Sequence, residues 1–239
     1  MKRKAMPLLF ILIVIGIFLL AAPAGAEGDN LLVNGDFKIL NNDGLPESWF
    51  VDAYRLDPGY SVFSMTEGKD GETSAILIQN TAKNDARLAQ TVSVRPESLY
   101  CFSAYVRADG VREGHGANLS VEGLYAFSEK KYDTDGQWQK IEYYGETGPD
   151  QHEVTVFARV GGYSGESKGT AAFCNLSLEE VEGLPDGVLA DLWYEPEPVY
   201  EEDEWTDEYY EEEERAADPA WPALTAVAVL SALIAFALI

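Results

Sequence analysis

Residues 99–107 read LYCFSAYVR and alternate between apolar and polar positions. Alternation with a period of two is typical of a β-strand that has one buried and one exposed face. One face holds Tyr100, Phe102, Ala104 and Val106, and the other holds Cys101, Ser103, Tyr105 and Arg107. We therefore expect the first set in a hydrophobic core, and Tyr105 and Arg107 on an outer surface.

Similar alternation recurs on both sides of this strand. The further candidate strands are residues 88–94, 118–127, 138–144, 153–160 and 171–181. Polar turn sequences separate them, such as RPES at 95–98 and DTDG at 133–136. Short strands at this spacing predict an all-β sandwich or barrel. The same parity places Glu122, Glu142, Tyr144 and Arg159 on outer faces.

The chain is strongly acidic, with a formal net charge of −24. Residues 195–214 alone hold twelve carboxylates and neither Lys nor Arg. A surface of this sign repels phosphate backbones, so we expect no nucleic acid among the partners. Neutral sugars are compatible with it, because they are recognised by ring stacking and hydrogen bonds more than by net charge.

The N-terminal residues have the pattern of a secretion signal. A basic stretch at 2–4 precedes an apolar run at 6–22, and AGA at 24–26 forms a small-residue cleavage site. We expect residues 1–26 to be a signal peptide, and an uncleaved signal anchor is the alternative. In both cases the following domain would be extracytoplasmic.

Three further regions differ in composition. The expected sandwich domain covers residues 27–182. Residues 183–220 are rich in Pro, Glu and Tyr, and the repulsion between like charges predicts a disordered linker. Residues 221–239 include eighteen uncharged residues from Pro222 onward, rich in Ala, Leu, Val and Ile, near the minimum length of a transmembrane helix. This C-terminal helix would attach the protein to the membrane, either as a tail anchor or as the first span of a larger membrane protein.

The chain also contains five short motifs between residues 30 and 178. They are NLLVNGDF at 30–37, GLPESW at 44–49, YCFSAYVR at 100–107, DGQW at 135–138 and GTAAFCNLSL at 169–178. In this order they resemble carbohydrate-binding modules of families 4, 9 and 22, which are galactose-binding-like jelly rolls. The resemblance implies a jelly-roll β-sandwich that binds carbohydrate, such as cell-envelope or extracellular glycan, without catalysis.

The motifs depart from these families at their calcium site. Family members often hold a structural calcium ion with a Glu after the first Phe and an Asp of the closing strand. Lys38 and the pair Cys174-Asn175 stand at these positions. An ammonium group cannot bind a cation, and calcium requires oxygen ligands. We therefore expect a weak or empty calcium site with Asp36 and Asn175 as candidate ligands, and no other cofactor.

Cys101 and Cys174 are the only cysteines of the chain. An even number of cysteines in an exported domain favours a disulfide. In the resembled fold, the two strands that carry them belong to the same core region. A Cys101–Cys174 bridge is therefore expected, and two buried free thiols are the alternative.

The sequence shows no catalytic constellation. His115 and His152 lack the HExxH spacing, and GYSGE at 162–166 has Glu where a nucleophile elbow needs its second Gly. We therefore predict a binding protein whose carbohydrate site combines aromatic, Arg and Glu side chains. The candidate residues are Tyr105, Arg107, Glu122, Glu142, Tyr144 and Arg159. An ordinary solvated sheet face with Arg–Glu pairs is the alternative.

Two other functions fit the same sequence. One is that of an N-terminal extracytoplasmic module in a larger membrane glycosyltransferase. The other is that of a structural or protein-interaction sandwich without a sugar site, since one fold hosts many functions. Whether a site exists, and on which face, is decided by the arrangement of the strands.

Overall fold

The computed structural model describes residues 29–71 and 74–196. The predicted signal peptide, the predicted transmembrane helix and most of the predicted linker lie outside the described residues. Within the described ranges, no helix is long and apolar enough to cross a membrane. The strands are β1 (Phe50–Ala53), β2 (Ser61–Glu67), β3 (Ser74–Asn84), β4 (Ala86–Ser93), β5 (Leu99–Arg112), β6 (Ala117–Val121), β7 (Gln139–Glu146), β8 (Glu153–Val160), β9 (Ser167–Glu180) and β10 (Asp191–Leu192).

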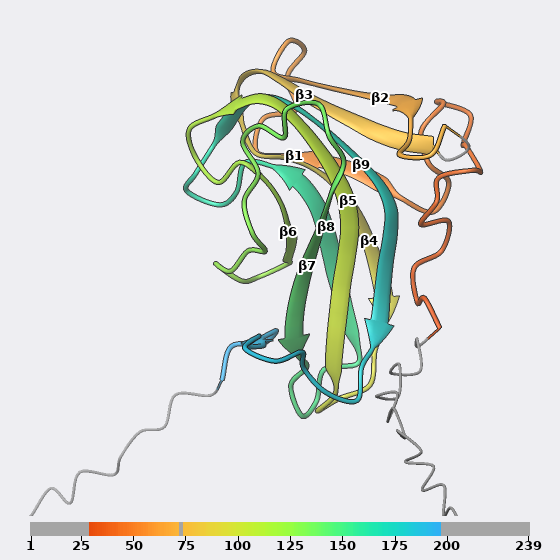
Figure 1. Ribbon diagram of the computed structural model, residues 1–239, viewed down its shortest axis with the longest axis vertical. Coiled ribbons are helices and arrows are strands. Elements are labelled where there is room, and N and C mark those ends of the chain that lie inside the picture. Colours follow the sequence, from red (N-terminus) through yellow and green to blue (C-terminus); the bar gives the residue numbers. More distant parts are fainter. Residues whose placement is uncertain (1–28, 72–73, 197–239) are drawn as a thin grey trace, which may run out of the picture. The chain divides into compact units, whose positions relative to one another are not determined.

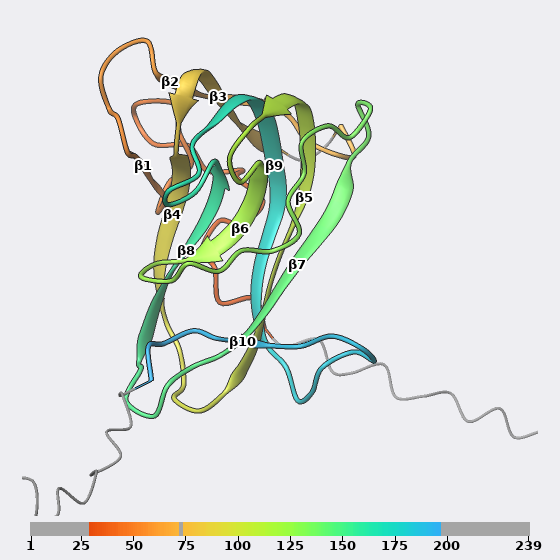
Figure 2. The same cartoon turned by 90° about the vertical axis from the view of Figure 1, so that its left-hand side faces the viewer.

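The strands form two sheets (Figure 1). The smaller sheet has the order β1-β4-β8-β6, and the larger sheet has the order β10-β7-β5-β9-β3-β2. Neighbouring strands are antiparallel, except that β10 runs parallel to β7. Figure 2 shows β10 near the lower end of β7. The predicted all-β fold is thus confirmed as a two-sheet architecture.

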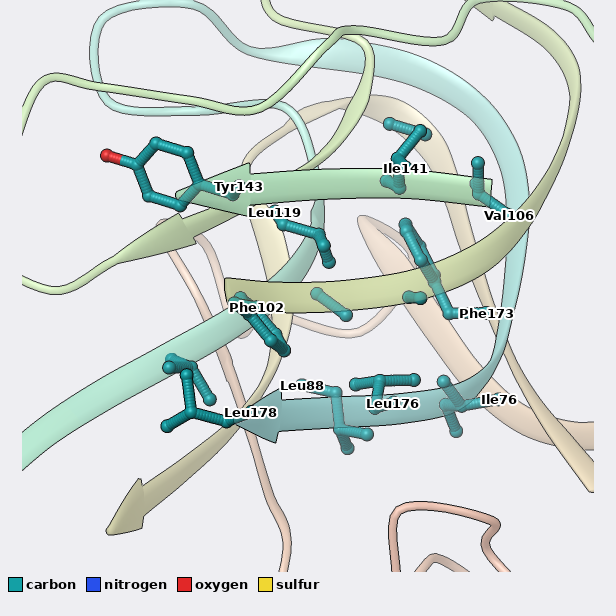
Figure 3. Packing of buried hydrophobic residues seen from close by; sticks show 14 of the residues in the cluster. Ile76, Leu88, Phe102, Val106, Leu119, Ile141, Tyr143, Phe173, Leu176 and Leu178 are labelled. Carbon is teal, nitrogen blue, oxygen red and sulfur yellow. The ribbon is translucent and has the colours of Figure 1, made fainter. Parts of the chain in front are cut away.

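The core lies between the two sheets. Along β5, buried and partly exposed side chains alternate from Leu99 to Ala108, so Phe102 is buried and Tyr105 is not, as the alternation predicts. Figure 3 shows Leu88 and Leu119 of the smaller sheet beside Ile76, Phe102, Val106, Ile141, Phe173, Leu176 and Leu178 of the larger sheet. Each such side chain contributes about 1.5–3 kcal/mol by leaving water.

The predicted strands 88–94, 138–144 and 153–160 agree with β4, β7 and β8 within two residues, whereas β5 continues to Arg112 and β9 begins at Ser167, beyond the predicted ends. The candidate strand 118–127 ends early, because β6 stops at Val121 and residues 122–138 form a loop. Gly123 in this loop has a φ of +83°, a left-handed conformation that glycine adopts without strain. The strands β1, β2, β3 and β10 add to those that the sequence predicts.

The first motif, NLLVNGDF at 30–37, packs against the closing strand β9. Gly35 O accepts a hydrogen bond from Leu176 N at 2.9 Å, and the Asn30 side chain binds Leu176 O at 3.1 Å and Leu178 N at 3.0 Å. A side chain at position 35 would overlap Leu176 O. Glycine is therefore required at this position of close backbone approach.

The packed region extends beyond residue 182, where the sequence predicts the linker to begin. β10 pairs with β7, and the next residue, Trp193, is 1% exposed. Its ring stacks on Tyr100 at 6.2 Å between centroids and passes over Gly145, where a Cβ atom would overlap the indole. The linker prediction was therefore wrong for residues 191–193, because a short strand with one aromatic anchor carries no periodic signal.

The predicted disulfide is wrong. In the β5–β9 ladder, Cys101 faces Glu179 and Cys174 faces Tyr105. The cysteines are thus four positions apart along β5, about 13 Å at 3.3 Å per residue. A disulfide requires Cα atoms within about 7 Å, and both thiols are free. Membership of the same core region does not fix the register of two strands.

The candidate calcium ligands do not form a calcium site. The Asp36 carboxylate pairs with Lys38 Nζ at 2.7 Å, and this hydrogen bond lowers the pKa of Asp36. Asn175 Oδ1 is buried and has no hydrogen-bond partner among the described residues. One carboxylate held by an ammonium group and one amide oxygen do not suit a cation that prefers six to eight oxygen ligands. The donor set therefore does not fit the calcium ion of the resembled families.

Candidate functional site

The structure divides the six predicted site residues between two faces. Tyr105 and Arg107 on β5, and Glu142 and Tyr144 on β7, belong to the larger sheet and point away from its buried face. Arg159 on β8 belongs to the smaller sheet, and Glu122 follows β6 of the same sheet. The two outer faces point in opposite directions, so the expected single patch does not form.

On the larger sheet, each candidate side chain is engaged with a neighbouring side chain. Lys69 Nζ lies 4.5 Å from the Tyr105 ring centroid, and the Arg107 guanidinium lies 4.7 Å from that of Trp138. Lys140 pairs with Glu142 at 2.6 Å, and the Tyr144 hydroxyl also reaches Glu142 at 3.3 Å. A cation thus covers one face of each of the two rings. This surface fits the alternative interpretation of a solvated sheet face with internal ion pairs.

On the smaller sheet, Arg159 is buried. Its side chain is 4% exposed, Nε donates to Asp85 Oδ1 at 3.0 Å, and Nη2 donates to Asp85 Oδ2. Nη1 donates to Ser120 Oγ at 3.0 Å. Burial lowers the pKa of the guanidinium, and the Asp85 carboxylate opposes this effect. An arginine stays protonated in proteins, so Arg159 and Asp85 form a buried bidentate ion pair.

A second arginine continues this network toward solvent. Arg87 on β4 faces Arg159 across the β4–β8 ladder. Its Nη1 donates to Asp85 Oδ2 at 2.8 Å, and its Nε donates to Asp52 Oδ2 at 2.8 Å. Both guanidinium groups lie near the Phe157 ring, with Cζ 5.1 Å and 5.5 Å from its centroid. The Arg87 side chain is 21% exposed, so one of the two cations is accessible to a ligand.

A cleft lies over this network. It consists of two cavities of about 440 and 490 Å³ that share Arg87 and Tyr163 in their linings. The first cavity is also lined by Phe157, Arg159, Glu122, Leu124, Tyr125 and Glu195, and the second by Tyr54, Asp85, Ser164 and Glu166. The sheet provides the floor, and the segments that follow β1, β6 and β8 provide the walls.

Three tyrosines on these walls are strongly exposed. The exposed fractions are 66% for Tyr54, 64% for Tyr125 and 73% for Tyr163. Tyr125 and Tyr163 meet edge to face, with ring centroids 6.5 Å apart. Exposed aromatic rings beside a partly exposed arginine can stack on C–H faces and donate hydrogen bonds. These are the interactions by which proteins hold sugars.

The sequence predicted two members of this cleft, Arg159 and Glu122. It missed Arg87, which lies one residue before the strand predicted at 88–94. The alternation of that strand, continued by one residue, places Arg87 on the outer face. It also missed Tyr54 and Tyr163, which lie on loops where no period applies. Tyr125 was missed because the strand wrongly predicted at 118–127 gives it the inward parity of Leu119 and Val121. The available signal was an aromatic residue close to glycine, as in the segments 123–125 and 161–163.

Comparison with known proteins gives matches among solved structures. No protein-family model and no curated protein matches the chain. The chain is similar to a putative sugar-binding protein from Bacteroides thetaiotaomicron VPI-5482, with TM-score 0.45 and 17% identity over 64% of this chain and 100% of that one. It is similar to TmCBM61 in complex with β-1,4-galactotriose, with TM-score 0.44 and 16% identity over 63% and 98% of the two chains.

Another similar structure is the enzymatically active domain of bacteriophage CBA120 tailspike protein 4. The TM-score is 0.45 and the identity 9%, over 64% of this chain but 21% of the tailspike chain. Several further similar structures are, or contain, carbohydrate-binding modules, the class that the motifs resemble. Identities this low concern the fold alone, so the chemistry of the cleft rests on its own side chains.

Proposed function

We propose that the protein binds a neutral glycan, without catalysis, in the cleft over the smaller sheet. The observation that carries this proposal is the combination of open tyrosine rings with partly used guanidinium groups. Each of Arg87 and Arg159 has five N–H groups, of which the network uses three. Two donors on each arginine therefore have no partner among the described residues. On Arg87, which is accessible, they can bind sugar hydroxyl groups.

The charge of the cleft supports a neutral ligand. Its lining combines two cations, Arg87 and Arg159, with four carboxylates from Asp85, Glu122, Glu166 and Glu195. Asp85 and Asp52 already neutralise both cations. An anionic sugar would meet an excess of negative charge, while hydroxyl groups can donate to the carboxylates and accept from the arginines. Uronic acids and sulfated sugars are therefore poor ligands in this proposal.

The first prediction tests whether the glycan binds on the outer face of the smaller sheet. Tyr54→Ala and Tyr163→Ala should each weaken glycan binding about fivefold, because each removes about 1 kcal/mol of ring stacking. The measurement is a glycan array with residues 27–196, followed by calorimetric titration of the neutral glycan that binds best. Tyr105→Ala is the matched control, a tyrosine on the opposite outer face that should leave binding unchanged. Loss of binding in the control alone, or an array without any glycan bound, contradicts the proposal.

A second part of the proposal concerns the location of the protein in the cell. We propose that the glycan-binding domain is held outside the cell, at its membrane, on an acidic linker. The support comes from the sequence alone: the signal-like residues 1–26, the acidic stretch at 195–214 and the apolar residues 222–239. In this arrangement the domain would face cell-envelope or extracellular glycan.

A further inference from the structure

One wall of the cleft is built around a buried histidine. His115 lies in the turn between β5 and β6 and is 9% exposed. Its backbone N donates to Gly165 O at 3.0 Å, and its ring stacks on Phe127 at 4.3 Å between centroids. A Cβ atom at Gly162 or Gly165 would overlap the imidazole. The loop at 161–166 therefore packs directly against this ring.

Both ring nitrogens of His115 have a partner from the 122–138 loop. Nδ1 lies 2.8 Å from Lys130 Nζ, and Nε2 lies 3.1 Å from the Tyr125 hydroxyl. An ammonium group has only donors, so Nδ1 must accept and cannot carry a proton. In the neutral ring the proton then sits on Nε2 and is donated to Tyr125 Oη. The two partners thus select one tautomer.

This tautomer determines what Tyr125 offers to the cleft. Because Tyr125 Oη accepts the proton of His115 Nε2, the hydroxyl's own hydrogen is available for another acceptor. Tyr125 lines the first cavity and is 64% exposed. Its ring also contacts His115 and Phe127 edge to face, at 5.4 Å between centroids in both cases. The hydroxyl is therefore fixed by its neighbours and directed as a donor.

We propose that neutral His115 is a positioning residue that presents the Tyr125 hydroxyl to the cleft as a hydrogen-bond donor for a sugar oxygen. The sugar part rests on the proposed function, whereas the Lys130–His115–Tyr125 arrangement stands on the contacts alone. Protonation of Nδ1 removes the acceptor for Lys130 and brings two cations together. The Tyr125 wall then loses its anchor, so glycan affinity falls at acid pH.

The charged groups around the ring favour its neutral form near pH 7. Burial is the largest cause that lowers the pKa of His115, and Lys130 and Arg159 lower it further. Asp85 and a hydrogen bond from the ring to the backbone carbonyl of Tyr163 act in the opposite direction, and the net shift is downward. Glu166 lies on the loop that packs against the ring. The transition is therefore expected below the ordinary histidine value of about 6.5.

Nitrogen-15 NMR of the imidazole in the full-length chain, in detergent micelles, tests the arrangement without any glycan. At pH 7 the expected signals are a protonated Nε2 and an unprotonated Nδ1. Lys130→Met should raise the pKa of His115, and Lys131→Met is the control because Lys131 pairs with Glu129 instead. A protonated Nδ1 at pH 7, or equal shifts in both variants, overturns the assignment of His115.

Binding of xylohexaose, a neutral probe, then tests the donor role. The affinity of the wild-type chain should fall about two- to tenfold between about pH 7.5 and about pH 5, the range of one neutral hydrogen bond. Tyr125→Phe should show the same loss at pH 7.5 and no further change on acidification. An affinity that is independent of pH overturns the donor role. Failure to bind xylohexaose at any pH counts against the proposed function for this sugar, while the NMR result still decides the role of His115.

Discussion

The arginine–aspartate pair at positions 159 and 85 shows how burial changes the role of a residue. Outward parity alone predicts that Arg159→Ala weakens binding and costs about 1 kcal/mol or less of stability, as surface changes do. In the structure, the substitution would remove the bidentate partner of Asp85, which is 5% exposed, and leave it paired only with the partly exposed Arg87. We therefore predict a loss of about 2–4 kcal/mol in the free energy of unfolding. Urea denaturation of residues 27–196 measures it.

The double variant Arg159→Ala, Asp85→Ala is the control for this prediction. It removes both charges, so it should be more stable than the single variant at position 159, because no carboxylate remains buried without its bidentate partner. Arg87 would then keep only Asp52 as its partner. A single variant that loses less than about 1 kcal/mol would show that Asp85 is solvated, which contradicts the buried network.

At the scale of the strand, periodicity predicted on which face of its sheet each side chain lies, but not which strands lie beside it. The alternation in 99–107 correctly separates Phe102 from Tyr105, because successive side chains of a strand point to opposite faces. The same rule gives Arg159 its outward direction. Sheet membership depends on pairing between distant strands, such as β8 with β4 and β6, and no local pattern specifies it. For this reason the predicted patch combined residues of two sheets.

Periodicity also does not predict which loops cover the outer face of a strand. Arg159 points outward from its sheet, yet the walls of the cleft and Asp85 bury it. These walls are loops without a repeating pattern, and their tyrosines become a site only through the fold. The all-β class, the core strand and the aromatic and arginine chemistry could thus be predicted from the sequence. The position of the cleft and the tyrosines that line it could not.

The docking of β10 onto β7 depends on one glycine. A Cβ atom at Gly145 would overlap the indole of Trp193, so Gly145→Ala should displace this side chain. We predict a loss of about 1–3 kcal/mol, as for other overpacked positions. Denaturant unfolding measures the loss, and tryptophan fluorescence should report greater exposure of Trp193. Gly183→Ala is the control, since that position has open space around it, and an equal effect in both variants would contradict the prediction.

At the scale of the whole molecule, the fold is held without a covalent crosslink between its cysteines. Cys174 is fully buried and Cys101 partly buried, and burial raises the pKa of both thiols. We therefore predict that a reductant leaves the melting temperature unchanged. A thiol reagent should modify Cys174 only after unfolding, as measured by mass spectrometry. A melting temperature that falls on reduction, or thiols that stay unreactive in denaturant until reduced, would show that the cysteines do form a disulfide.

The membrane attachment remains a prediction for the full-length chain. The apolar residues 222–239 would span about 27 Å as a helix at 1.5 Å per residue, close to the roughly 30 Å of a bilayer core. The twelve carboxylates of 195–214 repel one another, which favours an extended spacer between the helix and the domain. We predict that the full-length chain sediments with membranes and resists an alkaline carbonate wash.

A chain that ends at Ala217 separates the two possible anchors. It lacks the apolar C-terminal residues but keeps the signal-like residues 1–26. If the signal is cleaved, this shorter chain should appear in the soluble fraction, because no apolar segment of sufficient length is left to hold it. Its retention in membranes would identify the N-terminal segment as an uncleaved anchor. Recovery of the full-length chain itself in the soluble fraction would instead refute membrane attachment and, with it, the proposed display of the cleft at the cell surface.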